Sequence, residues 1–150
     1  MIGRILAVWL LSASAVSAQE LPALAVVVHP ASAVEDLTMD DLRHLFLGQT
    51  STWGDAGAVR LCEFAAERGT FYRSVLHMAE TQIDRHWIGV VFRGDRIEPP
   101  VKVARIDELL RLVSATPGAL AFVPLDSVSG GVKILSIEGV RPGEPSYPIG

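Results

Sequence analysis

Hydrophobic residues along the chain follow two alternating patterns, short continuous runs and longer stretches with helical spacing. Apolar residues spaced three and four apart predict helices at about 39–47, 69–79, 82–92 and 106–116. Continuous apolar runs, which are typical of buried strands, occupy residues 23–29, 58–64, 101–104, 119–125 and 132–137. Strands that alternate with helices predict an α/β fold, with a layered, mostly parallel sheet and helices on both of its faces.

Local signals predict where the first and third helices begin and end. Thr38 with Asp41 three residues later forms a capping-box pattern, and Gly48 is placed to end that helix in the left-handed conformation. Thr81 with Asp84 repeats the capping pattern before the third helix. In the first helix Phe46 is expected in the core, and Trp53 is expected to fold back over the edge of that core.

The first 18 residues predict a secretory leader. A basic residue, Arg4, precedes the apolar run 5–11, and the small residues Val16-Ser17-Ala18 fit a cleavage site. The alternative, a membrane anchor, needs about 20 apolar residues, and this run is much shorter. We therefore expect a periplasmic protein with one domain at 19–138 and a loose tail, rich in proline and glycine, at 139–150.

Charge and cysteine content narrow the classes of function. Removal of residues 1–18 leaves 12 basic and 17 acidic residues, and the basic ones are scattered, which disfavours nucleic acid or an anionic membrane as a partner. The single cysteine, Cys62, lies in an apolar run and is expected to be buried and inert. The sequence has no CxxC, HxH, HExxH or GxSxG motif, so we expect no metal, no cofactor and no enzymatic activity.

Four segments together resemble the phosphate-binding periplasmic substrate-binding proteins. The stretch 37–55, LTMDDLRHLFLGQTSTWGD, is similar to a helix, glycine and tryptophan segment of that family. The other three segments follow in the same order along the chain: ERGTFYRSVL at 67–76, HWIGVVFRG at 86–94 and TPGALAFVP at 116–124.

The resemblance implies the fold of one lobe of a type II periplasmic binding protein, because full-length members have two lobes and this chain is about half as long. It implies an exported solute-binding protein for phosphate or another small oxyanion, with an ABC transporter as its partner. The alternative is an accessory or protein-interaction module of the cell envelope that kept the fold without the ligand. A second lobe supplied by another chain is also open.

Five residues form the candidate ligand site. Gly69 and Thr70 open the second helix, whose free amides and positive dipole end favour an anion. Arg68 and Arg73 flank them with positive charge, and Ser32, after the first strand, adds a hydroxyl. Two glutamates near this helix start would oppose an anion, so a capped helix with two solvated arginines is the alternative interpretation.

Overall fold

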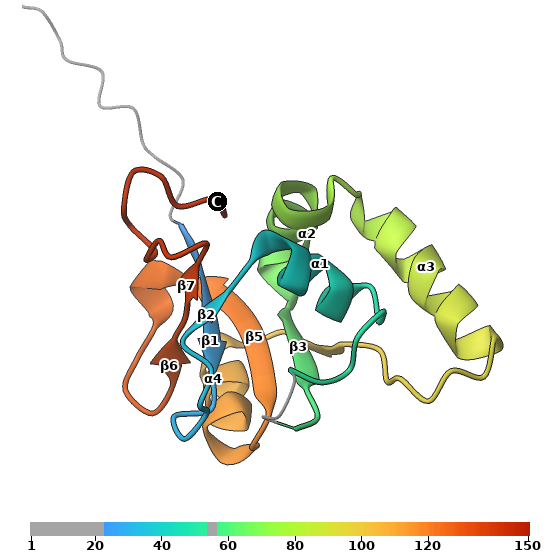
Figure 1. The fold of residues 1–150 in the computed structure, drawn as a ribbon, viewed down its shortest axis with the longest axis horizontal. Coiled ribbons are helices and arrows are strands. Elements are labelled where there is room, and N and C mark those ends of the chain that lie inside the picture. Colours follow the sequence, from blue (N-terminus) through green and yellow to red (C-terminus); the bar gives the residue numbers. More distant parts are fainter. Residues whose placement is uncertain (1–22, 54–56) are drawn as a thin grey trace, which may run out of the picture.

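A five-stranded sheet forms the centre of the computed structural model, which describes residues 23–53 and 57–150 (Figure 1). The leader predicted at 1–18 lies outside the described residues. The strand order is β4-β3-β5-β1-β6, and a separate parallel pair joins β2 to β7. The strands are β1 Leu24–Val28, β2 Asp36–Leu37, β3 Arg60–Phe64, β4 Val101–Val103, β5 Ala119–Pro124, β6 Lys133–Ile134 and β7 Ser136–Ile137.

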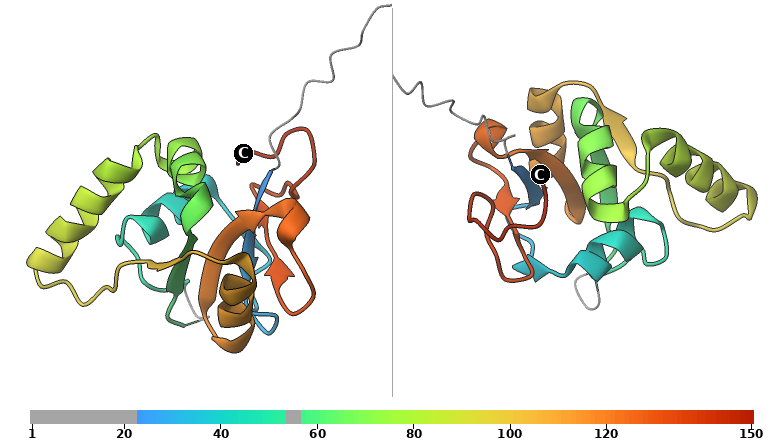
Figure 2. Two further views of the ribbon diagram at one scale, coloured as in Figure 1. Left: turned by 180° about the vertical axis from the view of Figure 1, so that it is seen from behind. Right: turned by 90° about the horizontal axis from the view of Figure 1, so that it is seen from above.

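Helices cover both faces of this sheet, as the sequence predicted (Figure 2). Side chains of α1, α2 and α3 share one apolar core with Val26 and Phe122, and α4 shares the other with Ala25 and Val27. Successive residues of β1 thus alternate between two cores, which explains why its sequence is apolar throughout. The helices are α1 Met39–Phe46, α2 Arg68–Leu76, α3 Glu80–Phe92 and α4 Ile106–Ala115, with short 3₁₀ helices η2 Ala65–Glu67 and η3 Leu125–Ser127.

The expectation of a mostly parallel sheet is wrong at β1. The strands β3, β4 and β5 are mutually parallel, whereas β1 runs antiparallel to both β5 and β6. A continuous apolar run indicates that a strand is buried on both faces. It does not indicate whether the strand runs parallel or antiparallel to its neighbours. This reversal decides which loops lie at the same edge of the sheet.

The first helix begins and ends where the sequence predicted. Thr38 and Asp41 form the reciprocal capping box, and Gly48 has a φ of +71°. Phe46 is fully buried, with its ring centroid 4.8 Å from that of Phe71, and Trp53 packs partly buried against the same core.

The aromatic neighbour of Gly48 is Trp87 of α3. A Cβ atom at Gly48 would lie 2.6 Å from the Trp87 ring, and the indole N–H donates to the Phe46 carbonyl at 3.1 Å. The turn after α1 therefore also fixes where α3 packs.

The predicted cap of α3 was wrong by two residues. The helix begins at Glu80, and the side-chain oxygen of Gln82 accepts a hydrogen bond from the backbone N–H of Ala79 at 2.7 Å. Asp84, which the sequence assigned to the cap, instead pairs with Arg68.

The segment after Glu138 is packed, not loose. The Tyr147 hydroxyl donates to the Leu24 carbonyl at 2.6 Å, and Ile149 is buried in the core shared with α1 and α2. Proline and glycine remove regular secondary structure from this segment, but two apolar side chains suffice to dock it.

The single cysteine lies in the second core, as expected. Cys62 is buried among Ala25, Val27 and Val103, and burial raises the pKa of its thiol to about 11. The thiol is therefore protonated near neutral pH and unreactive.

We predict that Gly48→Ala destabilises the protein more than Gly94→Ala does. Both glycines have positive φ, at +71° and +75°, but a Cβ at Gly94 meets no atom, whereas one at Gly48 meets Trp87. Both variants incur the left-handed penalty of roughly 1–2 kcal/mol, and Gly48→Ala adds an overpacking cost of about 1–3 kcal/mol. Urea unfolding of the two variants measures the difference; equal losses would contradict the packing described here.

Candidate functional site

α/β folds commonly bind ligands at the carboxyl ends of their parallel strands, and here three strands end on the same side of the sheet. At this edge β3 ends at Phe64, passes through η2, and continues directly into α2 at Arg68. The segment that carries most of the predicted site therefore lies at the expected edge of the sheet.

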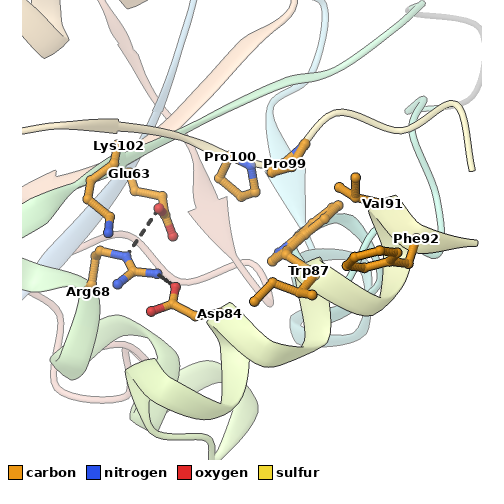
Figure 3. A pocket seen from close by; sticks show the side chains of 10 residues that line it. Glu63, Arg68, Asp84, Trp87, Val91, Phe92, Pro99, Pro100 and Lys102 are labelled. Atoms are coloured by element: carbon orange, nitrogen blue, oxygen red, sulfur yellow. Dashed lines mark hydrogen bonds and ion pairs between the residues drawn. The ribbon is translucent and has the colours of Figure 1, made fainter. Parts of the chain in front are cut away.

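Arg68 is buried, with 6% of its surface exposed, and three carboxylates surround it. Figure 3 shows two of them, Glu63 and Asp84. Its Nε lies 3.1 Å from Glu63 Oε1, Nη1 lies 3.3 Å from Glu80 Oε1, and Nη2 lies 2.6 Å from Asp84 Oδ1. Glu63 is buried as well, at 3% exposure, whereas the side chains of Glu80 and Asp84 are about half exposed. The guanidinium thus links β3 to both α2 and α3.

Tyr72 completes this buried cluster. Its hydroxyl donates to Glu63 Oε2, and its ring centroid lies 5.7 Å from the Arg68 guanidinium carbon. Burial raises the pKa of Tyr72, and the negative charge of Glu63 raises it further. Burial alone would lower the pKa of Arg68, but its pairs with Asp84 and Glu63 outweigh that effect and raise it.

The positive charge of Arg68 is therefore compensated within the protein. Gly69 is close to the same acids, because a Cβ there would lie 3.7 Å from Glu80 Oε2. Thr70 is partly buried on the same helix, and Arg73 is exposed about 140° around the helix axis from Arg68. The structure groups Arg68, Gly69 and Thr70, but Arg73 does not converge on them.

Ser32 lies at the opposite end of the strands from Arg68. It follows the carboxyl end of β1, where Val28 pairs with Leu120, near the start of β5. Arg68 follows the far end of β3, which runs parallel to β5. The grouping of Ser32 with Arg68 presupposed a parallel β1, and the antiparallel direction separates them. Ser32 instead lines a separate pocket with His29, Ala31, Ala33, Trp53, Pro117 and Gly118.

An open apolar pocket of about 400 Å³ adjoins the Arg68 cluster (Figure 3). One wall is α3, where Ile88, Val91 and Phe92 are 57%, 54% and 86% exposed. The opposite wall is the segment that leads into β4, with Pro99 and Pro100. Pockets of this size and apolar character are typical of binding sites.

This surface was not predicted from the sequence, because Val91 is four residues from Trp87 and so has the spacing of a buried position. Ile83, Trp87 and Val90 are buried, but Val91 and Phe92 face away from that core. The sequence does contain a signal for this surface. Apolar residues occur on all sides of the carboxyl-terminal half of α3, whereas an ordinary surface helix has a single apolar stripe.

Within residues 23–53 and 57–150, no three His, Cys, Asp or Glu side chains are arranged to hold a metal ion. None of the helices in those same ranges has the length and hydropathy needed to cross a bilayer.

The fold is similar to that of solved phosphate receptors. A phosphate transport receptor from Vibrio cholerae matches with a TM-score of 0.66 and 21% identity, over 85% of this chain and 53% of that one. PstS from Borrelia burgdorferi matches with a TM-score of 0.62 and 18% identity, over 85% and 54%. A substrate-binding protein from Clostridium perfringens, solved with bound phosphate, matches with a TM-score of 0.57 and 17% identity, over 81% and 47%.

This chain therefore spans about half the length of these receptors. No protein-family model matches the sequence, and no curated protein matches it. The likeness confirms the predicted fold, a mixed α/β lobe of the phosphate-receptor type.

We predict that Arg68→Met destabilises the protein by about 3–5 kcal/mol, because it leaves the Glu63 carboxylate buried without its counter-ion. Asp84→Asn is the matched control: its side chain is 52% exposed, so the loss should stay near or below ~1 kcal/mol. Adding Glu63→Gln to Arg68→Met should recover part of the loss. Chemical unfolding of the variants measures these effects, and a loss at Arg68 no larger than that at Asp84 would refute the assignment.

Proposed function

We propose that this chain is an exported protein-interaction module built on one half of the phosphate-receptor fold, which acts in the cell envelope and not as an enzyme. The observation that carries the proposal is the exposed apolar wall of α3 beside the 400 Å³ pocket. Contiguous exposed apolar surface of this kind marks interaction sites. The predicted leader, Val16-Ser17-Ala18 included, supports export.

The polar end of the site favours this function over anion binding by the lone chain. Arg68 already contacts three carboxylates, two of which come from α3. An anion at this corner would meet those negative charges and would have to displace them from Arg68. An apolar group that enters the pocket can pack against its apolar lining, which includes Trp87, Pro99 and Pro100, and it need not displace a carboxylate from Arg68.

Solute binding is the second candidate function. The fold is that of receptors for phosphate, one of them solved with phosphate bound, and Gly69 and Thr70 open a helix at the carboxyl end of a parallel strand. On this candidate the ligand is phosphate or another small oxyanion, and the partner is a membrane transporter. Of the five residues predicted from the sequence, the three at the start of α2 then act together, whereas Ser32 lies at the opposite end of the strands and Arg73 on another side of α2.

We predict that a photo-crosslinking amino acid at position 92 captures a partner in intact cells. Phe92 is 86% exposed in the proposed interface, so an attached probe reaches whatever covers it. The same probe at Arg111 on α4, whose side chain is 75% exposed, is the control and should give no adduct. Mass spectrometry identifies the adducts. Equal labelling from both positions, or none from position 92, would sink the interaction proposal.

We predict that calorimetric titration with phosphate or sulfate gives no saturable heat up to about 10 mM, where even ~4 kcal/mol of binding energy would register. If heat appears, titration of Thr70→Val and of Ser32→Ala shows at which end of the strands the anion binds. Loss of the heat in Thr70→Val alone would establish the solute-binding function at α2 and reject the interaction module as the primary role.

A further inference from the structure

We infer that the pocket beside Arg68 binds a free α-amino acid with a large apolar side chain, in its zwitterionic form. The inference goes beyond the proposed function, because it assigns the pocket a small ligand of its own, whereas a partner protein covers the exposed side chains of α3. The pocket is the one of about 400 Å³ between α3 and the segment that leads into β4.

The charged and the apolar side chains that line this pocket are separated. Figure 3 shows the charged residues together at one end and the apolar residues at the other. The charged end has Glu63, Arg68, Asp84 and Lys102. The apolar end is formed by Trp87, Val91 and Phe92 of α3 and by the two prolines before β4. A ligand that fits carries its charge at one end and an apolar group at the other.

The charges at the polar end sum to zero, since two carboxylates lie there with two cations. Glu80 and Arg85, which are exposed on α3 and do not line the pocket, offset each other. Just past α3, Arg93 and Asp95 pair with each other at 3.4 Å and add no net charge either. A lone anion at the polar end would lie near the carboxylates, and a lone cation would lie near the two cations. A zwitterion has one charge for each sign, so it complements this end.

Two groups at the polar end are free to take the two charges of the ligand. Lys102 is exposed and, within residues 23–53 and 57–150, belongs to no ion pair. Asp84 contacts Arg68 Nη2 through Oδ1 at 2.6 Å, and its side chain is 52% exposed, so Oδ2 remains for a ligand. The ligand carboxylate therefore accepts from Lys102, and the ligand ammonium donates to Asp84.

The apolar end accommodates the side chain of the ligand. In an α-amino acid the ammonium and carboxylate groups are attached to one carbon atom or its neighbour, and the side chain projects away from both. Val91 and Phe92 are mostly exposed, so a phenyl ring or a branched chain that packs against them and Trp87 removes apolar surface from water. A methyl side chain is too short to gain this contact.

The walls of the pocket are held in place by the fold. Asp84 is paired with Arg68, Lys102 lies in strand β4, and the Trp87 indole N–H donates to the Phe46 carbonyl at 3.1 Å. Such preorganisation lowers the cost of binding. Because the pocket is open on one side, the ligand stays partly in water, and the dissociation constant is on the order of 1 mM.

An NMR titration of the isotope-labelled exported chain with L-phenylalanine, up to about 10 mM, tests the inference. Saturable shifts are expected at Asp84, Val91 and Lys102 and at the Trp87 indole N–H. L-Alanine, which lacks the large side chain, should bind at least about tenfold more weakly. N-acetyl-L-phenylalanine and L-phenylalaninamide, which each lack one charge, should weaken by about the same factor. These two derivatives also stand for the carboxyl and amino ends of a polypeptide, so they distinguish a free amino acid from a protein terminus.

Substitutions assign the two charges. Lys102→Met and Asp84→Asn should each weaken binding of L-phenylalanine about tenfold, and Arg111→Gln on α4 should leave it unchanged. The NMR spectrum of each variant shows whether it is folded. No saturable shift with L-phenylalanine, equal binding of either derivative, or unchanged binding in folded Lys102→Met would each overturn the inference. Any of these results leaves the proposed interaction surface standing, because crosslinking from position 92 tests that surface separately.

Discussion

The buried ion cluster around Arg68 holds together the three elements on which the site depends. Glu63 comes from β3, Arg68 and Tyr72 from α2, and Asp84 from α3. A guanidinium with so little solvent contact is tolerable only because carboxylates compensate it, and Glu63 in turn needs both Arg68 and the Tyr72 hydroxyl. The three elements are therefore coupled: a change in the position of α3 removes a counter-ion from Arg68, and the buried charges then resist it.

The same cluster occupies the corner of the fold where a ligand could bind. In an α/β sheet the corner between a parallel strand and the following helix is where ligands commonly bind. Here the protein's own carboxylates occupy the positions around the arginine that an external anion would take. The polar residues at this corner form ion pairs within the protein, and the apolar pocket beside them is the surface that stays accessible.

Much of the fold followed from local sequence signals. The capping box at Thr38, the glycine after α1 and the apolar runs of the strands are determined by neighbouring residues, so they were predicted correctly. Strand direction, the docking of Ile149 and the pairing of Arg68 with Asp84 depend on residues far apart in the sequence. The predicted grouping of site residues differs from the structure for the same reason: Ser32 was grouped by analogy with a parallel sheet, and Asp84, which pairs with Arg68, was assigned to a helix cap.

The position of β1 has a consequence for the order of events as the chain is made. This strand begins at Leu24, yet its partners are β5, at 119–124, and β6, at 133–134, and its Leu24 carbonyl accepts from Tyr147. This interior strand of the sheet therefore has no partner strand until most of the polypeptide has been synthesised. Contacts this distant in sequence make folding slow. The sheet can thus be completed only when residues 119–134 have been synthesised, so its assembly takes place at the end of translation or after it.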